Sequence, residues 1–129
     1  MTPVAEQTDP LRSAVEDGTL DRDAFERTRK IYVRSKRLQF GHALKLSAQT
    51  FTEAIDAASH AAEADDTETI AQAMHEMKAS AGQLGAIALR EHAIAIETAA
   101  RDGGVDRERL AALPELLERW REIVVAHPD

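Results

Sequence analysis

A histidine and a lysine lie three residues apart in a segment whose composition favours a helix. His75 and Lys78 have the small residues Ala71 and Ala79 as neighbours, and Gly82 follows one turn further on. Because residues i, i+3 and i+4 adjoin on a helix, these positions are expected to share one face. A large partner surface would reach the imidazole there without meeting a bulky side chain. Such a face suits a histidine that exchanges a chemical group with another folded protein.

The chemistry best suited to this histidine is phosphoryl transfer. A neutral imidazole is nucleophilic near physiological pH, and its attack on a phosphoryl group gives a phosphohistidine. Lys78 would supply a cation for the phosphoryl oxygens. The other ring nitrogen needs an acceptor for its proton. Glu97, beside the inward-facing Ile96 of the next predicted helix, is the best candidate, and an exposed helix carboxylate is its alternative interpretation.

The segment around His75 resembles the signature of histidine-containing phosphotransfer (HPt) domains. That signature usually reads H-x-L-K-G-S-A-x-x-L-G-A, and residues 75–86 read H-E-M-K-A-S-A-G-Q-L-G-A. The resemblance covers roughly residues 36–126. Ala79 stands where the family usually has glycine, and Met77 replaces a leucine. Neither difference removes a chemically active group.

The resemblance implies a helical bundle that relays phosphoryl groups to and from an aspartate on receiver domains, without an ATP site. It implies His75 as phospho-acceptor, Lys78 as partner of the phosphoryl oxygens and Glu97 as the residue that orients the imidazole. The expected docking surface consists of Ala71, Gln72, Ala79 and Gly82. The implied partners are response-regulator receiver domains and a hybrid or sensor histidine kinase. The chain would be a monomeric phosphocarrier rather than an enzyme, with no cofactor of its own and Mg²⁺ on the partner receiver domain.

Two other functions remain open. Residues 75–78 also resemble the H-box of sensor histidine kinases, which form dimeric helical hairpins. That box normally continues with threonine or asparagine and then proline, whereas Ala79 and Ser80 follow here without an ATP-binding domain. The non-catalytic alternative is a helical adaptor that binds receiver domains without being phosphorylated.

The composition excludes several other classes of function. The chain has 129 residues, enough for one compact domain, and no cysteine, which excludes disulfides, thiolate zinc sites and cysteine nucleophiles. No histidine pair has metal-site helical spacing, so no metal is expected. A net charge of −7 argues against general nucleic-acid binding. Without a bilayer-spanning apolar run or a signal-peptide region, we expect a cytoplasmic protein that does not bind membranes.

The charge is unevenly distributed along the chain. Residues 22–45 carry eight basic side chains against Asp23 and Glu26, so this segment is +6 and the remainder is −13. The segment is either a solvated helix face or a patch that steers an acidic partner.

Helices are expected to position these residues. Abundant alanine and only 4% aromatic residues favour closely packed helices, and apolar residues recur at steps of three and four. The expected helices cover residues 21–35, 38–62, a segment capped by Asp65 and Glu68 that bends or ends by Gly85, 87–101, and a last segment capped by Asp106. Residues 21–35 either continue into the next helix or break near Ser35. Pro114 either kinks the last helix or marks its start.

These helices predict an all-α fold, an antiparallel four-helix bundle with an additional N-terminal helix. Residues 1–20 contain Pro3, Pro10 and Gly18 and show no clear period, which indicates a flexible or loosely docked lead-in. Residues 21–129 would form a single helical phosphotransfer domain, with residues 127–129 frayed.

Overall fold

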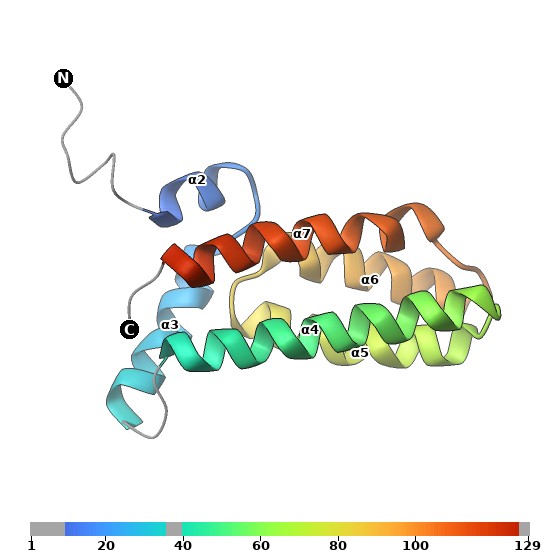
Figure 1. Ribbon diagram of the computed structural model, residues 1–129, viewed down its shortest axis with the longest axis horizontal. Coiled ribbons are helices and arrows are strands. Elements are labelled where there is room, and N and C mark those ends of the chain that lie inside the picture. Colours follow the sequence, from blue (N-terminus) through green and yellow to red (C-terminus); the bar gives the residue numbers. More distant parts are fainter. Residues whose placement is uncertain (1–9, 36–39, 127–129) are drawn as a thin grey trace.

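The computed structural model of the protein describes residues 10–35 and 40–126, which form helices joined by short turns (Figure 1). Its helices are α2 (Pro10–Glu16), α3 (Arg22–Ser35), α4 (Phe40–Glu63), α5 (Thr67–Gln83), α6 (Ile87–Arg101) and α7 (Arg107–Ala126). No strand occurs in these two ranges, so the predicted all-α class is confirmed for them. The connection near Ser35 and the fraying of the last residues concern segments 36–39 and 127–129, which lie outside the described residues.

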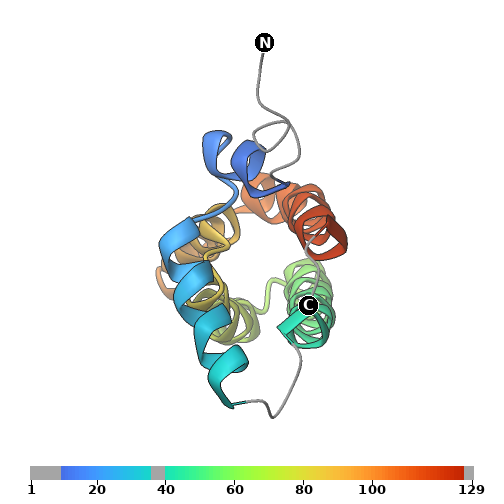
Figure 2. The same ribbon diagram turned by 90° about the vertical axis from the view of Figure 1, so that its left-hand side faces the viewer.

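The four longest helices pack in a ring. Helix α4 contacts α5 and α7, and α6 contacts the same two helices. Figure 2 views this ring end-on, with α4 and α7 on one side and α5 and α6 on the other. Helix α3 crosses one end and contacts α4 and α5, while α2 lies against α7 (Figures 1 and 2).

The core inside the ring is built from the residues at steps of three and four. The largest fully buried side chains of the described residues are Phe25, Leu44, Phe51, Ile70, Met74, Met77, Leu89, Ile96, Leu113 and Trp120. Each such side chain stabilises the fold by roughly 1.5–3 kcal/mol relative to exposure. Phe51 of α4 and Trp120 of α7 meet edge to face with ring centroids 5.3 Å apart. This contact joins the two helices within the core.

The turn between α4 and α5 places the helix cap one residue later than predicted. Asp66 is the N-cap of α5, and its carboxylate accepts a hydrogen bond from the Thr69 backbone N–H at 3.2 Å. Asp65 has a φ of +53° and accepts a 2.9 Å hydrogen bond from Arg107. The predicted Asp65–Glu68 capping pair is therefore wrong, because Asp65 takes the left-handed conformation that closes the turn.

Helix α5 ends at Gln83, which agrees with the predicted bend or end by Gly85. Gly85 has a φ of +72°, and its carbonyl accepts a 2.6 Å hydrogen bond from the Asp21 backbone N–H. The Thr19 carbonyl accepts a second one from Ile87 N–H at 3.1 Å. The turn after α5 is thus attached to the segment that enters α3.

Residues 10–20 differ from the expected flexible or loosely docked lead-in. They contain α2, and Ala14, Thr19 and Leu20 are buried. Apolar contacts and backbone hydrogen bonds place this stretch against the bundle. Residues 1–9 lie outside the described residues.

Helix α7 begins as predicted after Asp106, which accepts a hydrogen bond from the Arg109 backbone N–H at 3.1 Å. Pro114 lies inside this helix, so the alternative that it marks the helix start is wrong. None of the described helices is long and apolar enough to cross a bilayer.

Candidate functional site

Helices α5 and α6 bring the three predicted site residues together along their shared seam. The short turn at residues 84–86 makes the two helices antiparallel neighbours (Figure 1). On α6, Arg90, Ile94, Glu97 and Arg101 follow one another at steps of four, three and four, and so share one helix face. His75 and Lys78 lie on the opposing part of α5.

A single carboxylate organises this site. Glu97 Oε2 lies 3.2 Å from His75 Nδ1, and Glu97 Oε1 lies 2.6 Å from Lys78 Nζ. Arg101 donates to Glu97 Oε2 from two nitrogens, at 2.6 and 2.9 Å. The Glu97 side chain is only 6% exposed, so its alternative interpretation as an exposed carboxylate is wrong.

The site holds Glu97 in its ionised form. Burial acts to raise the pKa of Glu97, but hydrogen bonds and positive charge from Lys78 and Arg101 outweigh it and lower that pKa to about 2. An ionised carboxylate accepts hydrogen bonds only. A neutral His75 therefore donates its Nδ1–H to Glu97 and carries its lone pair on Nε2.

The imidazole is accessible from solvent, since the His75 side chain is 55% exposed. Among the residues predicted to form the docking surface, Gln72 and Ala79 are exposed and Gly82 is partly exposed. Ala71 is 5% exposed and packs in the core, where it borders a hollow at the Arg101 end of the seam. The accessible surface near His75 thus includes three of the four predicted positions fully or in part.

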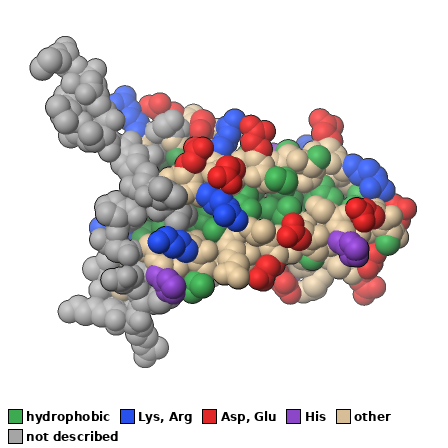
Figure 3. All heavy atoms as spheres, viewed as in Figure 1, with side chains coloured by type: hydrophobic (Ala, Val, Ile, Leu, Met, Phe, Trp, Pro, Cys, Tyr) green, Lys and Arg blue, Asp and Glu red, His purple; other side chains and the backbone are tan. Residues whose placement is uncertain are grey.

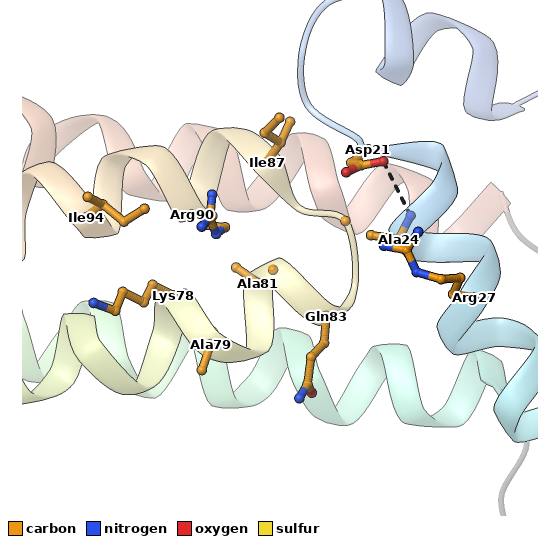
Figure 4. Close-up of a pocket in the computed structure, with 12 residues that line it drawn as sticks. Asp21, Ala24, Arg27, Lys78, Ala79, Ala81, Gln83, Ile87, Arg90 and Ile94 are labelled. Carbon is orange, nitrogen blue, oxygen red and sulfur yellow. Dashed lines mark hydrogen bonds between the residues drawn. The ribbon is translucent and has the colours of Figure 1, made fainter.

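Beyond Lys78 the seam widens into a groove of about 670 Å³. Its walls come from α5, α6 and α3, and include Ala79, Gly82, Arg90, Ile94, Ala24 and Arg27. In Figure 4, Arg27 reaches from α3 toward the turn that ends α5, and Arg90 lies on α6 across the groove. A Cβ on Gly82 would stand 3.3 Å from Arg90 Cδ and Nε, so glycine leaves the room in which Arg90 lies against α5.

Sequence reasoning missed Arg101 and Arg90. Arg101 lies four residues after Glu97 and Arg90 seven residues before it, and this spacing places both on the helix face of Glu97. The spacing could have identified them in the sequence. The sequence identified the basic segment 22–45, but it did not show which of these residues lie near the site. Arg27 lines the groove, whereas Arg29 pairs with Glu26 at 3.3 Å. The side chains of Arg34, Lys36 and Arg37 lie outside those that the structure describes.

The face formed by α4 and α7 carries charges of both signs, whereas Lys78, Arg90 and Arg27 come together in the groove. There, acidic and basic side chains are interspersed (Figure 3). His60 is exposed on α4, and Glu63 one turn further on is its ion-pair neighbour at 3.8 Å. No cluster of metal-binding side chains occurs within residues 10–35 and 40–126.

The comparisons with known proteins agree with this geometry. The family model of the Hpt domain matches residues 42–123, which run from α4 into α7 and include His75, Lys78 and Glu97. No curated protein and no solved structure matches the chain. Helices α2 and α3 lie before the matched range. The match covers more than half of the chain, so the protein belongs to the Hpt domain family, whose members are phosphocarrier modules of histidine phosphotransfer in phosphorelays.

Proposed function

We propose that the protein is a histidine phosphotransfer protein of a two-component phosphorelay. His75 accepts a phosphoryl group from the aspartyl phosphate of one receiver domain and passes it to the aspartate of another. The observation that carries this proposal is the contact between Nδ1 of the half-exposed imidazole and the buried Glu97 carboxylate at 3.2 Å. That contact leaves Nε2 as the nucleophile on the open side.

The transfer step follows from this arrangement. The Nε2 lone pair of His75 attacks phosphorus, and the bond between phosphorus and the aspartyl oxygen breaks with its electron pair returning to the carboxylate. The product is a phosphorylated imidazolium, whose positive charge faces the Glu97 carboxylate through Nδ1–H. The reverse step on a second receiver domain restores the neutral ring. Mg²⁺ bound by the receiver domain would stabilise the transferring group.

Lys78 supplies a cation next to the phosphoryl oxygens. Its side chain is 32% exposed and lies one helical turn from His75. An ammonium group on a flexible stem suits this role, since it follows a moving charge without a fixed bonding plane. Removing this ammonium group by Lys78→Ala should therefore slow transfer, whereas the contact between Arg101 and Glu97 should remain.

Receiver domains of response regulators and of a hybrid or sensor histidine kinase would dock over the open part of the seam. Gln72, Ala79 and Gly82 would lie under the partner, with Ala71 at the edge of the contact. Such a chain acts as a monomer, and the packing of α4 to α7 within one chain supports this state. The dimeric kinase-like hairpin requires a dimer, which light scattering would reveal.

The test is transfer from a panel of radiolabelled phospho-receiver domains to the native protein and to His75→Gln. His60→Gln is the control, because His60 is exposed on α4 with only a 3.8 Å ion-pair contact. We expect acid-labile, base-stable label on the native protein and on the control, and none on His75→Gln. Equal labelling of His75→Gln would contradict the proposal. Absence of label from a folded native protein across the panel would favour the adaptor interpretation.

A further inference from the structure

The Glu97 carboxylate is held by two cations that come from different helices. Lys78 of α5 contacts Oε1, and Arg101 of α6 contacts Oε2 through two nitrogens. His75 Nδ1 faces the same Oε2. Arg101 therefore fixes the oxygen to which the imidazole donates, whereas Lys78 holds the other one.

Phosphoryl transfer makes competing demands on Lys78. In the free protein its ammonium group pairs with Glu97, but a phosphoryl group on His75 would attract the same ammonium. A buried carboxylate that loses its only cation is strongly destabilised, because desolvation is no longer compensated. Glu97 is 6% exposed and would face this cost if Lys78 were its only charged partner.

Arg101 removes this conflict. It is four residues after Glu97 on the same helix, so its contact does not depend on α5 or on what is bound there. Two nitrogens of the planar guanidinium converge on Oε2, whereas the ammonium of Lys78 is a point charge on a flexible stem.

We propose that Arg101 is a positioning residue for the transfer reaction, which keeps Glu97 aligned with His75 Nδ1 when Lys78 turns to the phosphoryl group. This inference rests on the proposed function of His75. Helix α6 supplies Glu97 and Arg101, whose contact would persist during transfer. Helix α5 supplies the nucleophile and Lys78, which would move to the phosphoryl group. The contacts of Arg101 in the structure are to Glu97 Oε2, so it would act on the transfer reaction through Glu97.

The test compares Arg101→Gln and Arg101→Lys with Arg119→Gln. Arg119 is a matched control, because it forms an exposed pair with Glu115 four residues earlier at 3.6 Å on another helix. Two quantities are measured: the rate of transfer from a phospho-receiver domain, and the ¹⁵N shifts of the His75 ring, which report its tautomer in the free protein. Thermal unfolding and circular dichroism confirm that each variant is folded.

We expect Arg101→Gln to slow transfer by on the order of tenfold, by analogy with residues that orient metal-binding histidines through a hydrogen bond. The His75 ring should then lose its preference for the proton on Nδ1. Arg101→Lys should restore part of both properties, and Arg119→Gln should change neither. Lys78→Ala should slow transfer yet keep the tautomer, because Arg101 still holds Oε2.

A native rate and an unchanged tautomer in a folded Arg101→Gln protein would overturn this inference, although His75-dependent transfer would still stand. If the native protein accepts no phosphoryl group, the proposed function fails instead. The tautomer shifts still report on Arg101 in that case, because they need no phosphorylated species. An unchanged tautomer in Arg101→Gln would then reject the positioning role as well.

Discussion

At the scale of single residues, the proposed chemistry depends on the buried carboxylate that contacts His75. Glu97 contacts Nδ1 of the ring, and the His75 side chain is 55% exposed, so Nε2 is the nitrogen that we propose as the nucleophile. The same carboxylate would stabilise the positive charge that the ring acquires when it carries a phosphoryl group. In the proposed reaction, this contact would orient the imidazole before the partner arrives and so would lower the entropy cost of transfer.

The ionisation of Glu97 gives a prediction for stability against pH. Its pKa is about 2 in the folded protein against 4.5 when unperturbed, so the folded state favours the charged form. The resulting stability is complete above pH 4.5 and is lost as the pH falls toward 2. Urea unfolding of the native protein and of Glu97→Gln between pH 6 and pH ~2.5 measures this effect. The advantage of the native protein should shrink over that range, and a constant difference would contradict the assignment.

The residues that meet at the candidate site were partly predictable. His75, Lys78 and Glu97 follow from helical spacing and from the position of Glu97 on the next helix. Arg101 and Arg90 did not emerge, because an exposed arginine four or seven residues from a glutamate is common on helix surfaces. Only the packing of α5 on α6 shows that this glutamate is buried and contacts two cations.

At the scale of elements, the turn between α5 and α6 fixes both the seam and the N-terminal helices. Gly85 closes this turn in a left-handed conformation and accepts a hydrogen bond from Asp21. Built onto Gly85, a Cβ would collide with the Asp21 carbonyl. The glycine is therefore required by its backbone conformation and by the close approach of α3.

This geometry predicts that Gly85→Ala destabilises the protein more than Gly103→Ala. Both glycines have positive φ, +72° and +86°, but no atom lies within 4 Å of a Cβ on Gly103. Gly103→Ala should cost about 1–2 kcal/mol for the left-handed conformation alone. Gly85→Ala should add the cost of displacing the segment around Asp21. Urea unfolding compares them, and equal losses would show that this close approach contributes nothing.

Four of the helices were predictable from their apolar steps, which locate α4 to α7 to within a few residues. The cap at Asp66 was missed by one residue, because Asp65 and Asp66 offer the same side chain and only the backbone conformation distinguishes them. The docking of residues 10–21 was missed for a related reason. Its hydrogen bonds join backbone groups of Thr19 and Asp21 to the α5–α6 turn, and such contacts leave no side-chain pattern.

At the scale of the whole molecule, cations gather at one place on a chain with a net charge of −7. Lys78, Arg90 and Arg27 line one groove next to His75, although they come from three helices. The third of these, α3, precedes the residues matched by the family model. The groove therefore combines helices within the match with a segment outside it, and Arg27 is the basic residue of segment 22–45 that lines it.

Charge removal in this groove should slow the encounter with an acidic receiver domain. We expect Arg27→Gln to lower kcat/KM for transfer at low ionic strength, with the difference shrinking as salt screens the charges. Lys45→Gln is the control, because Lys45 is exposed in the same basic segment but does not line the groove. Equal effects of the two variants would assign the steering to overall charge instead of the groove.

The central claim is that His75 carries the phosphoryl group on Nε2. The most direct test is ³¹P and ¹⁵N NMR of the protein with ¹⁵N-labelled histidine, recorded after phosphorylation by a phospho-receiver domain. The geometry predicts phosphorus coupled to Nε2 of His75 and a proton retained on its Nδ1. Phosphorus on Nδ1, on another histidine, or on no histidine at all would contradict the account.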